Sequence, residues 1–132
     1  MGGRTLGVAT AESCAEFVAV PYIATTVTQA VFIAEFPCIV SKISGRQRVN
    51  GGSGAQMVFY KCASGVAAAS GTLLHSGVFD ASSAGTADAN QSLTMAIRDN
   101  RTLNIGDSIN MVVSGTMTSA VGFIQLTVEP LA

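Results

Sequence analysis

The stretch RTLNIGDSINMVVSG, Arg101–Gly115, is the most regularly patterned part of the chain. It contains an apolar segment, a Gly-Asp pair, a run in which apolar and polar residues alternate, and a closing glycine. Strict alternation is typical of a β-strand with one buried face. Ile109, Met111 and Val113 are therefore predicted to point into a core. Asp107 then has two candidate roles, a catalytic or metal-binding acid or a residue of a β-corner.

We interpret Gly106 and Asp107 as a structural corner. Gly106 can adopt a positive φ without steric cost. The Asp107 carboxylate is expected to accept hydrogen bonds from the backbone amides just after it. Leu103 and Ile105 are expected to pack beneath the corner. On this interpretation Asp107 needs no ligand, so Asp107→Asn should preserve function whereas Gly106→Val should damage folding.

The rest of the chain repeats the β-pattern, with turns and loops rich in Gly, Ser, Ala and Asn between the strands. No window keeps a helical period over three turns, and the alanine-rich segment 67–69 is interpreted as a loop with at most one turn. We therefore predict an all-β, single-domain β-sandwich or jelly roll of about eight antiparallel strands. Residues 1–25 are expected to form an extended N-terminal arm and first edge segment, and residues 26–132 the sandwich. The expected strands are 17–20, 27–35, 38–49, 55–63, 72–79, 91–99, 107–115 and 121–131.

Several strands carry more detailed expectations. Pro21 cannot donate to a ladder and so confines the first strand to an edge. The run 27–35 is apolar at nearly every position in its later half, which predicts a strand covered on both faces. Strands 38–49 and 55–63 are expected to pair as a hairpin around the glycine-rich turn 51–54. Alternation further predicts two sets of residues, each of which shares one face of its strand. The first set is Ile39, Ser41, Ile43 and Gly45. The second set, which is expected to point inward, is Leu93, Met95 and Ile97.

The composition excludes several classes of function. Hydrophobic residues make up 48% of the chain and charged residues 11%, against a usual charged share of about 25%. The net charge is −1, no basic patch marks a nucleic-acid or membrane surface, and no apolar run is long enough to span a membrane. The N-terminus lacks a signal-peptide core, which predicts synthesis in a cytoplasm. So few charges favour burial in an oligomer or a larger assembly, with a monomer that has a Ser/Thr-rich surface as the alternative.

The sequence contains no constellation of residues that specifies a reaction. His75 is the only histidine, and we interpret it as a packed or surface residue. Cys14, Cys38 and Cys62 are far apart and form no metal-binding pair. The carboxylates show no metal-binding spacing, and no serine lies in a nucleophile elbow. We therefore expect that the protein is not an enzyme and that it binds no cofactor, no metal and no small-molecule substrate.

Four segments stand out when they are taken in order, and together they span about residues 31–130. They are FIAEFPCIVSKIS (32–44), TLLHSGVFDASSAGTADANQSLT (72–94), RTLNIGDSINMVVSGT (101–116) and VGFIQLTVEPL (121–131). In this order they resemble the capsid decoration (cement) proteins of tailed bacteriophages and related head-fibre modules, which are small jelly rolls. The Gly-Asp corner by itself is less specific, because it also occurs in trimers similar to tumour necrosis factor and C1q.

The resemblance implies a homotrimer that sits on the exterior of a phage head, binds the major capsid protein and stabilises the assembled shell. Such a protein would be made in the cytoplasm of a bacterial host. The resemblance transfers no catalytic or ligand-binding residue. Candidate contacts with the capsid or a neighbouring subunit are the segment 1–25, as an arm that pairs with a neighbour's sheet edge, and a group of basic residues. The candidate contact residues are Val20, Pro21, Tyr22, Lys42, Arg46 and Arg48.

A receptor- or carbohydrate-binding module of a phage fibre or spike is the alternative function. It would use the same sandwich, with loops 63–71 and 80–90 as the ligand surface. Those loops are rich in Ala, Ser and Gly, and they lack the aromatic platform and acid-amide clusters that sugar sites commonly use. The sequence therefore favours the decoration protein over the binding module.

Overall fold

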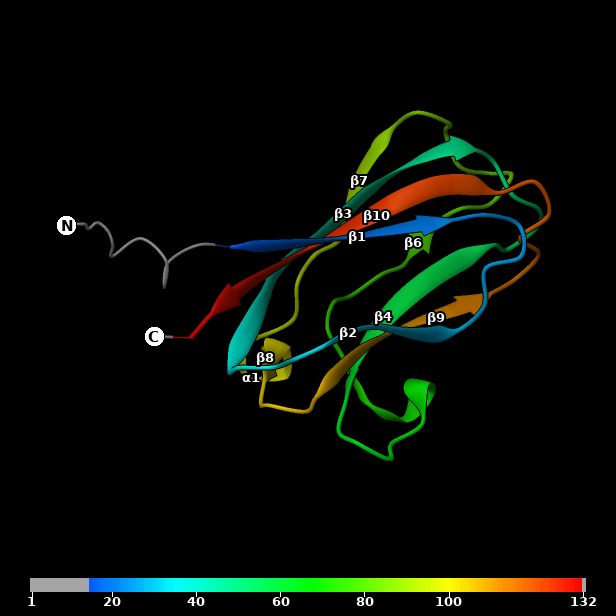
Figure 1. Cartoon of the computed structure of the whole chain (residues 1–132). Helices are drawn as coiled ribbons and strands as arrows, with labels where there is room; N and C mark the ends of the chain where they lie inside the picture. The colour runs from blue at the N-terminus through cyan, green and yellow to red at the C-terminus, as the bar shows by residue number, and fades with distance from the viewer. Residues whose placement is uncertain (1–14, 132) are drawn as a thin grey trace.

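The computed structural model describes residues 15–131, which form two antiparallel β-sheets packed face to face (Figure 1). Two short helical turns, the 3₁₀-helix η2 (Ala68–Ser70) and α1 (Arg98–Arg101), lie outside the sheets. Sheet A contains β1 (Glu16–Tyr22), β10 (Val121–Pro130), β3 (Cys38–Val49), β7 (Asn90–Ser92) and β8 (Thr102–Leu103). Sheet B contains β2 (Gln29–Ile33), β9 (Ser108–Ser114), β4 (Gln56–Cys62), β5 (Thr72–Leu73) and β6 (Phe79–Asp80).

The strand order is that of a jelly roll. Strands β5 and β6 both pair with β4, and β7 and β8 both pair with β3, so each of these couples occupies one position in its sheet. If each couple is counted as one position along the chain, the first, last, third and sixth positions lie side by side in that order in sheet A. In sheet B the order is second, seventh, fourth and fifth. This order, with the first and last strands adjacent in one sheet, confirms the predicted all-β sandwich of the jelly-roll type.

The core lies between the two sheets and is built from alternate residues of each long strand. Ile109 and Met111 of β9 are fully buried, as predicted, and Val113 is partly buried against them. Burial of a large apolar side chain stabilises a fold by about 1.5–3 kcal/mol, so this alternation is what holds the sheets together. The other fully or nearly fully buried large side chains are Tyr22, Ile43, Met57, Phe59, Leu74, His75, Phe79, Leu103, Ile124 and Leu126.

The predicted hairpin between strands 38–49 and 55–63 is wrong. Strand β3 belongs to sheet A and β4 to sheet B, and the glycine-rich segment 51–54 carries the chain from one sheet to the other. Its backbone bonds to loops at the same end of the sandwich, with Gly51 N donating to Ala81 O at 2.7 Å. A Cβ added at Gly51 would lie 2.7 Å from that same oxygen, so the connection requires glycine there.

A β-bulge changes the faces of β3. The register with β10 shifts between Thr127 and Val128, whose partners are Lys42 and Val40, so Ser41 is an extra residue. Before the bulge Val40 points inward, and after it Ile43 does. The prediction that Ile39, Ser41, Ile43 and Gly45 share one face is therefore wrong, because a one-residue slip exchanges the two faces of a strand.

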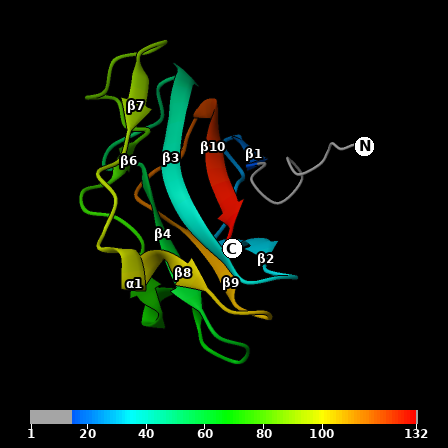
Figure 2. The same cartoon turned by 90° about the vertical axis from the view of Figure 1, so that its left-hand side faces the viewer.

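The predicted strand 91–99 ends early. Only β7 is part of the sheet, and after an isolated bridge between Met95 and His75 the chain turns into α1. Figure 2 shows β7 and β8 on the same side of β3, with α1 beside β8. Leu93 and Met95 pack against the core, but Ile97 is 70% exposed, so its predicted inward position is wrong. Arg101 holds the turn by donating to Ala96 O at 2.7 Å and to Val40 O at 2.9 Å.

The segment 63–71 contains one 3₁₀ turn, η2, as expected for a loop with at most one helical turn. It packs against β4, where Cys62 Sγ lies 3.3 Å from Ala68 O. Within residues 15–131 no helix has the length and apolar character needed to cross a membrane.

Candidate interaction surfaces

The Gly106–Asp107 segment forms a tight corner between β8 and β9. Gly106 has a φ of +91°, a conformation that side-chain-bearing residues rarely adopt. Asp107 Oδ2 accepts a hydrogen bond from Asn104 N at 2.9 Å, an amide before it in the chain rather than after it as expected. Leu103 is fully buried beneath the corner, but Ile105 is 67% exposed, so its expected packing there is wrong.

The corner also joins two loops. Gly106 N donates to Ala34 O at 2.9 Å, and Ala34 N donates to Asp107 O at 2.8 Å. These bonds tie the end of β2 to the start of β9. The backbone and carboxylate of Asp107 are thus occupied in local structure, which accounts for its place in the sequence pattern.

His75 is a buried structural residue. Its exposed fraction is 2%, Nε2 accepts a hydrogen bond from Phe59 N at 3.0 Å, and Nδ1 lies 3.0 Å from Ser76 O. The neutral tautomer with the proton on Nδ1 satisfies both contacts. Burial lowers the pKa of His75, and this outweighs the opposing effect of its hydrogen bond to Ser76. The ring therefore stays neutral and is bonded on both sides.

The cysteines of the described residues are also structural. Cys38 and Cys62 are free and buried, and burial raises the pKa of the Cys38 thiol, with smaller contributions from Glu16 and Asp107. A raised pKa keeps Cys38 a protonated, unreactive thiol. Cys14 lies outside the described residues. Within residues 15–131 no group of three or more His, Cys, Asp or Glu side chains is arranged to hold a metal ion.

The segment predicted as arm and edge, 1–25, is partly a strand of the sandwich itself. Residues 1–14 lie outside the described part of the chain, and β1 pairs along its whole length with β10. Alternate residues of β1 therefore enter the core: Val20 is 6% exposed and Tyr22 is 1% exposed. Their side chains do not reach the surface and so cannot make the predicted contact with a capsid or a neighbouring subunit, whereas Pro21 points outward and is exposed.

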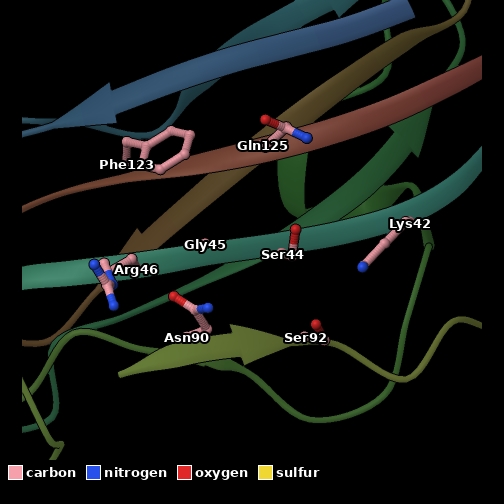
Figure 3. A pocket seen from close by; sticks show the side chains of 8 residues that line it. All are labelled: Lys42, Ser44, Gly45, Arg46, Asn90, Ser92, Phe123 and Gln125. Atoms are coloured by element: carbon pink, nitrogen blue, oxygen red, sulfur yellow. The ribbon is translucent and has the colours of Figure 1, made fainter. Parts of the chain in front are cut away.

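The basic residues Lys42, Arg46 and Arg48 are all exposed on β3. They lie on the outer face of sheet A because the residues between them, such as Ile43 and Gln47, are buried in the core. Lys42 and Arg46 line a shallow groove of about 420 Å³, and Arg48 lies outside it. We call this feature the sheet A groove; Figure 3 shows its residues on β3, β7 and β10.

Sequence reasoning missed an apolar surface along one side of the sandwich. Strands β1 and β2 are edge strands of opposite sheets, and residues 23–28 connect them (Figure 1). Four large apolar side chains on these strands and their connection are more than half exposed. We call this surface the open side: Phe17 (66%), Ile23 (55%), Val27 (63%) and Ile33 (62%).

The signal for the open side was present in the sequence as the apolar run 27–35. That run predicts a strand covered on both faces, but Gln29, Ala30 and Ile33 of β2 are exposed. Strand β2 is also an edge strand that pairs with β9, with a register shift between Ala30 and Phe32. A groove of about 220 Å³ lies beside its end, lined by Phe32, Ile33 and Phe36 together with two glutamates. The prediction of cover on both faces is thus wrong within the described residues, which leave one side of β2 uncovered.

Comparison with known proteins gives two similar structures. One is a chain of the structure described as "Cyanophage Pam1 capsid asymmetric unit", with 15% identity, coverage of 96% of this chain and 91% of that chain, and a TM-score of 0.48. The other comes from "Bacillus endospore appendages form a novel family of disulfide-linked pili", with 15% identity, coverage of 90% and 88%, and a TM-score of 0.36. No family model and no curated protein matches the chain. At these TM-scores neither structure assigns a function, so the fold assignment rests on the strand order of this chain.

Proposed function

We propose that the chain is a structural virion protein, a capsid decoration (cement) protein that binds the assembled head shell of a phage as a homotrimer. Its partners are the major capsid protein and its own copies, and its place is the exterior of the capsid. The four segments that resemble decoration proteins support this proposal, as does the jelly-roll strand order of the chain.

The open side is the single observation that carries the proposal. Apolar surface left in water costs about 25 cal/mol per Å². Four large apolar side chains that are more than half exposed along β1, β2 and their connection therefore support a site of interaction on this side. Phe17 lies near the start of β1 and Ile33 is the last residue of β2, whereas Ile23 and Val27 belong to the connection between the two strands. A surface with so few charges also suits burial between subunits. We place the contacts between copies of the chain here.

The mechanism of such a protein is mass action. A ligand that binds the assembled shell and not its free subunits stabilises the shell by RT ln(1 + [L]/Kd) at each site. A trimer that contacts several capsid subunits adds the gain of multivalent binding. Lys42, Arg46 and Arg48 are exposed, as contact with an acidic capsid surface would require, and that contact stays a prediction. The proposed role includes no catalysis and no cofactor.

Co-sedimentation with empty, expanded phage heads tests this function. We expect the wild-type chain to sediment with the heads and to raise their melting temperature. Ile33→Asp places a charge on the open side and should abolish both effects. The matched control is Ile97→Asp, because Ile97 is 70% exposed but lies beside α1. Binding that survives Ile33→Asp, or a wild-type chain that stays in the supernatant, would contradict the proposal.

A further inference from the structure

The register of sheet A builds the sheet A groove from three strands. Phe123 of β10 pairs with Arg46 of β3, which pairs in turn with Asn90 of β7. All three point outward, because their neighbours along β10 and β3, including Ile124, fill the core. Strands lie about 4.8 Å apart, so this row spans about 10 Å from the phenyl ring to the amide.

A second row lies next to the first and consists only of amide and hydroxyl groups. Gln125 pairs with Ser44, which pairs with Ser92. Ser44 has a small side chain, so it forms the floor of the groove between the longer side chains on either side (Figure 3). Lys42 follows on β3, four residues from Arg46 and therefore about 13 Å away along the strand. The groove thus has a cation at each end and neutral donors and acceptors between them.

The charge of the groove is opposite to that of the chain. Its lining contains two cations, Lys42 and Arg46, and no carboxylate, in a chain whose net charge is −1. Arginine binds a carboxylate through two parallel hydrogen bonds, which makes it the preferred partner for that group. Charge complementarity therefore favours an anionic ligand.

Phe123 narrows the class of ligand. It is 42% exposed although its ring is apolar, and it forms one wall of the groove beside the amide of Gln125. An aromatic ring next to a few well-placed polar groups is the usual lining of a small-molecule site. A pyranose ring presents an apolar C–H face that packs on a phenyl ring and hydroxyls that bond to amides and serines. The distance of about 13 Å along β3 between Lys42 and Arg46 leaves room for more than one such ring.

Two macromolecular ligands suit the groove less well. An extended peptide usually adds to a free sheet edge. Strands β10 and β3 lie inside sheet A and offer none, and β7, which lies at the edge, contains only 3 residues for pairing. A nucleic acid needs a track of cations along its backbone, and this groove has two.

We propose that the sheet A groove binds an acidic saccharide, with Arg46 and Lys42 on its carboxylates and Phe123 against a sugar ring. This is a function beyond the proposed structural role and does not depend on it. The site lies on the face of sheet A and not on loops 63–71, and it takes only Asn90 from the end of the 80–90 loop.

Isothermal titration with defined sugars tests the proposal. The probes are tri-galacturonic acid, tri-mannuronic acid and 3′-sialyllactose, with neutral galactotriose and hexaglutamate as comparison ligands. We expect at least one acidic sugar to bind and to bind more tightly than both comparison ligands. Arg46→Gln should weaken that binding about tenfold or more, the size expected for losing a hydrogen bond to a charged group. Phe123→Ala should weaken it as well.

Arg48→Gln is the matched control, because it removes the same charge from the same strand but outside the groove. It should leave sugar binding unchanged. An equal loss with Arg48→Gln, equal binding of hexaglutamate, or no binding by any of the three acidic sugars would overturn the proposal. Capsid co-sedimentation of Phe123→Ala separates the two functions, because Phe123 lines the groove and is not among the residues predicted to contact the capsid. Loss of sugar binding with capsid binding retained supports a saccharide site that is independent of the shell.

Discussion

Strands β2 and β9 lie side by side in sheet B, and they differ in what covers them. Strand β9 has neighbours on both sides, and its residues Ile109 and Met111 are completely buried. Strand β2 has one neighbour, and Ile33 near its end is 62% exposed although its sequence is as apolar as that of a core strand. An apolar run therefore indicates that a strand will be covered, but it does not say whether the cover comes from the same chain.

The largest expected difference between the two strands is in stability. Met111→Ala should lower the free energy of unfolding by about 2–5 kcal/mol, because it leaves a cavity between the sheets. Ile33→Ala should lower it by less than about 0.5 kcal/mol, because this side chain is mostly in water in the single chain. Urea denaturation at low protein concentration measures both values. Similar losses for the two variants would mean that β2 is buried within the chain and would remove the contrast.

The corner between β8 and β9, which is also hydrogen-bonded to the end of β2, comes next. Gly106→Val should destabilise the fold by about 2 kcal/mol, since a β-branched residue is strained at a φ of +91°. Asp107→Asn should cost less than about 1 kcal/mol, because an amide oxygen can still accept from Asn104 N. Thermal unfolding and capsid co-sedimentation of both variants check this. A folded Asp107→Asn chain that has lost capsid binding would reopen a functional role for the carboxylate.

The stability of the core should also depend on pH in the alkaline range. Tyr22 on β1 is buried, packs edge-on against Phe79 with ring centroids 5.9 Å apart, and has its pKa raised to about 12, mainly by burial and also by Asp80. Its ordinary pKa is 10.0, so the unfolded chain loses this proton first as the pH rises. Stability should fall between pH 10 and 12 with a slope of up to about 1.4 kcal/mol per pH unit. The slope of Tyr22→Phe should be smaller; an unchanged slope would show that Tyr22 ionises as if exposed.

At acidic pH the stability should depend on His75, and here it should fall as the pH is lowered. The pKa of this buried ring is lowered from 6.5, so below about pH 6.5 the unfolded chain takes up a proton that the folded chain excludes. Stability contributed by the neutral ring is present above pH 6.5 and is lost as the pH falls. His75→Gln keeps an acceptor for Phe59 N and should flatten the curve below pH 6.5. A variant curve parallel to that of the wild type would contradict the buried, neutral assignment.

Much of the fold follows from the sequence because alternation reports the face of a strand. The inward residues of β9 and the glycine of the corner follow from that pattern and from backbone sterics. The bulge at Ser41 does not, because a bulge exists only relative to a partner strand. The glycine-rich segment 51–54 was misinterpreted for a related reason: a turn between two strands has the same composition whether it closes a hairpin or changes sheets.

The candidate surfaces depend even more on strand order. Lys42 and Arg46 stand out in the sequence as basic residues, but Phe123 and Asn90 join them only through the register of three distant segments. Val20 and Tyr22 were expected at the surface because β1 was interpreted as part of an arm. Their burial follows from the pairing of β1 with β10, which no local pattern reports.

The molar mass of the purified chain in solution, measured by light scattering at micromolar concentration, tests the central claim most directly. The claim is that other copies of the chain cover the open side. It predicts three chain masses for the wild type and for Ile97→Asp, and one chain mass for a folded Ile33→Asp. A wild-type chain with the mass of one chain, or an Ile33→Asp chain with the mass of three, would contradict it.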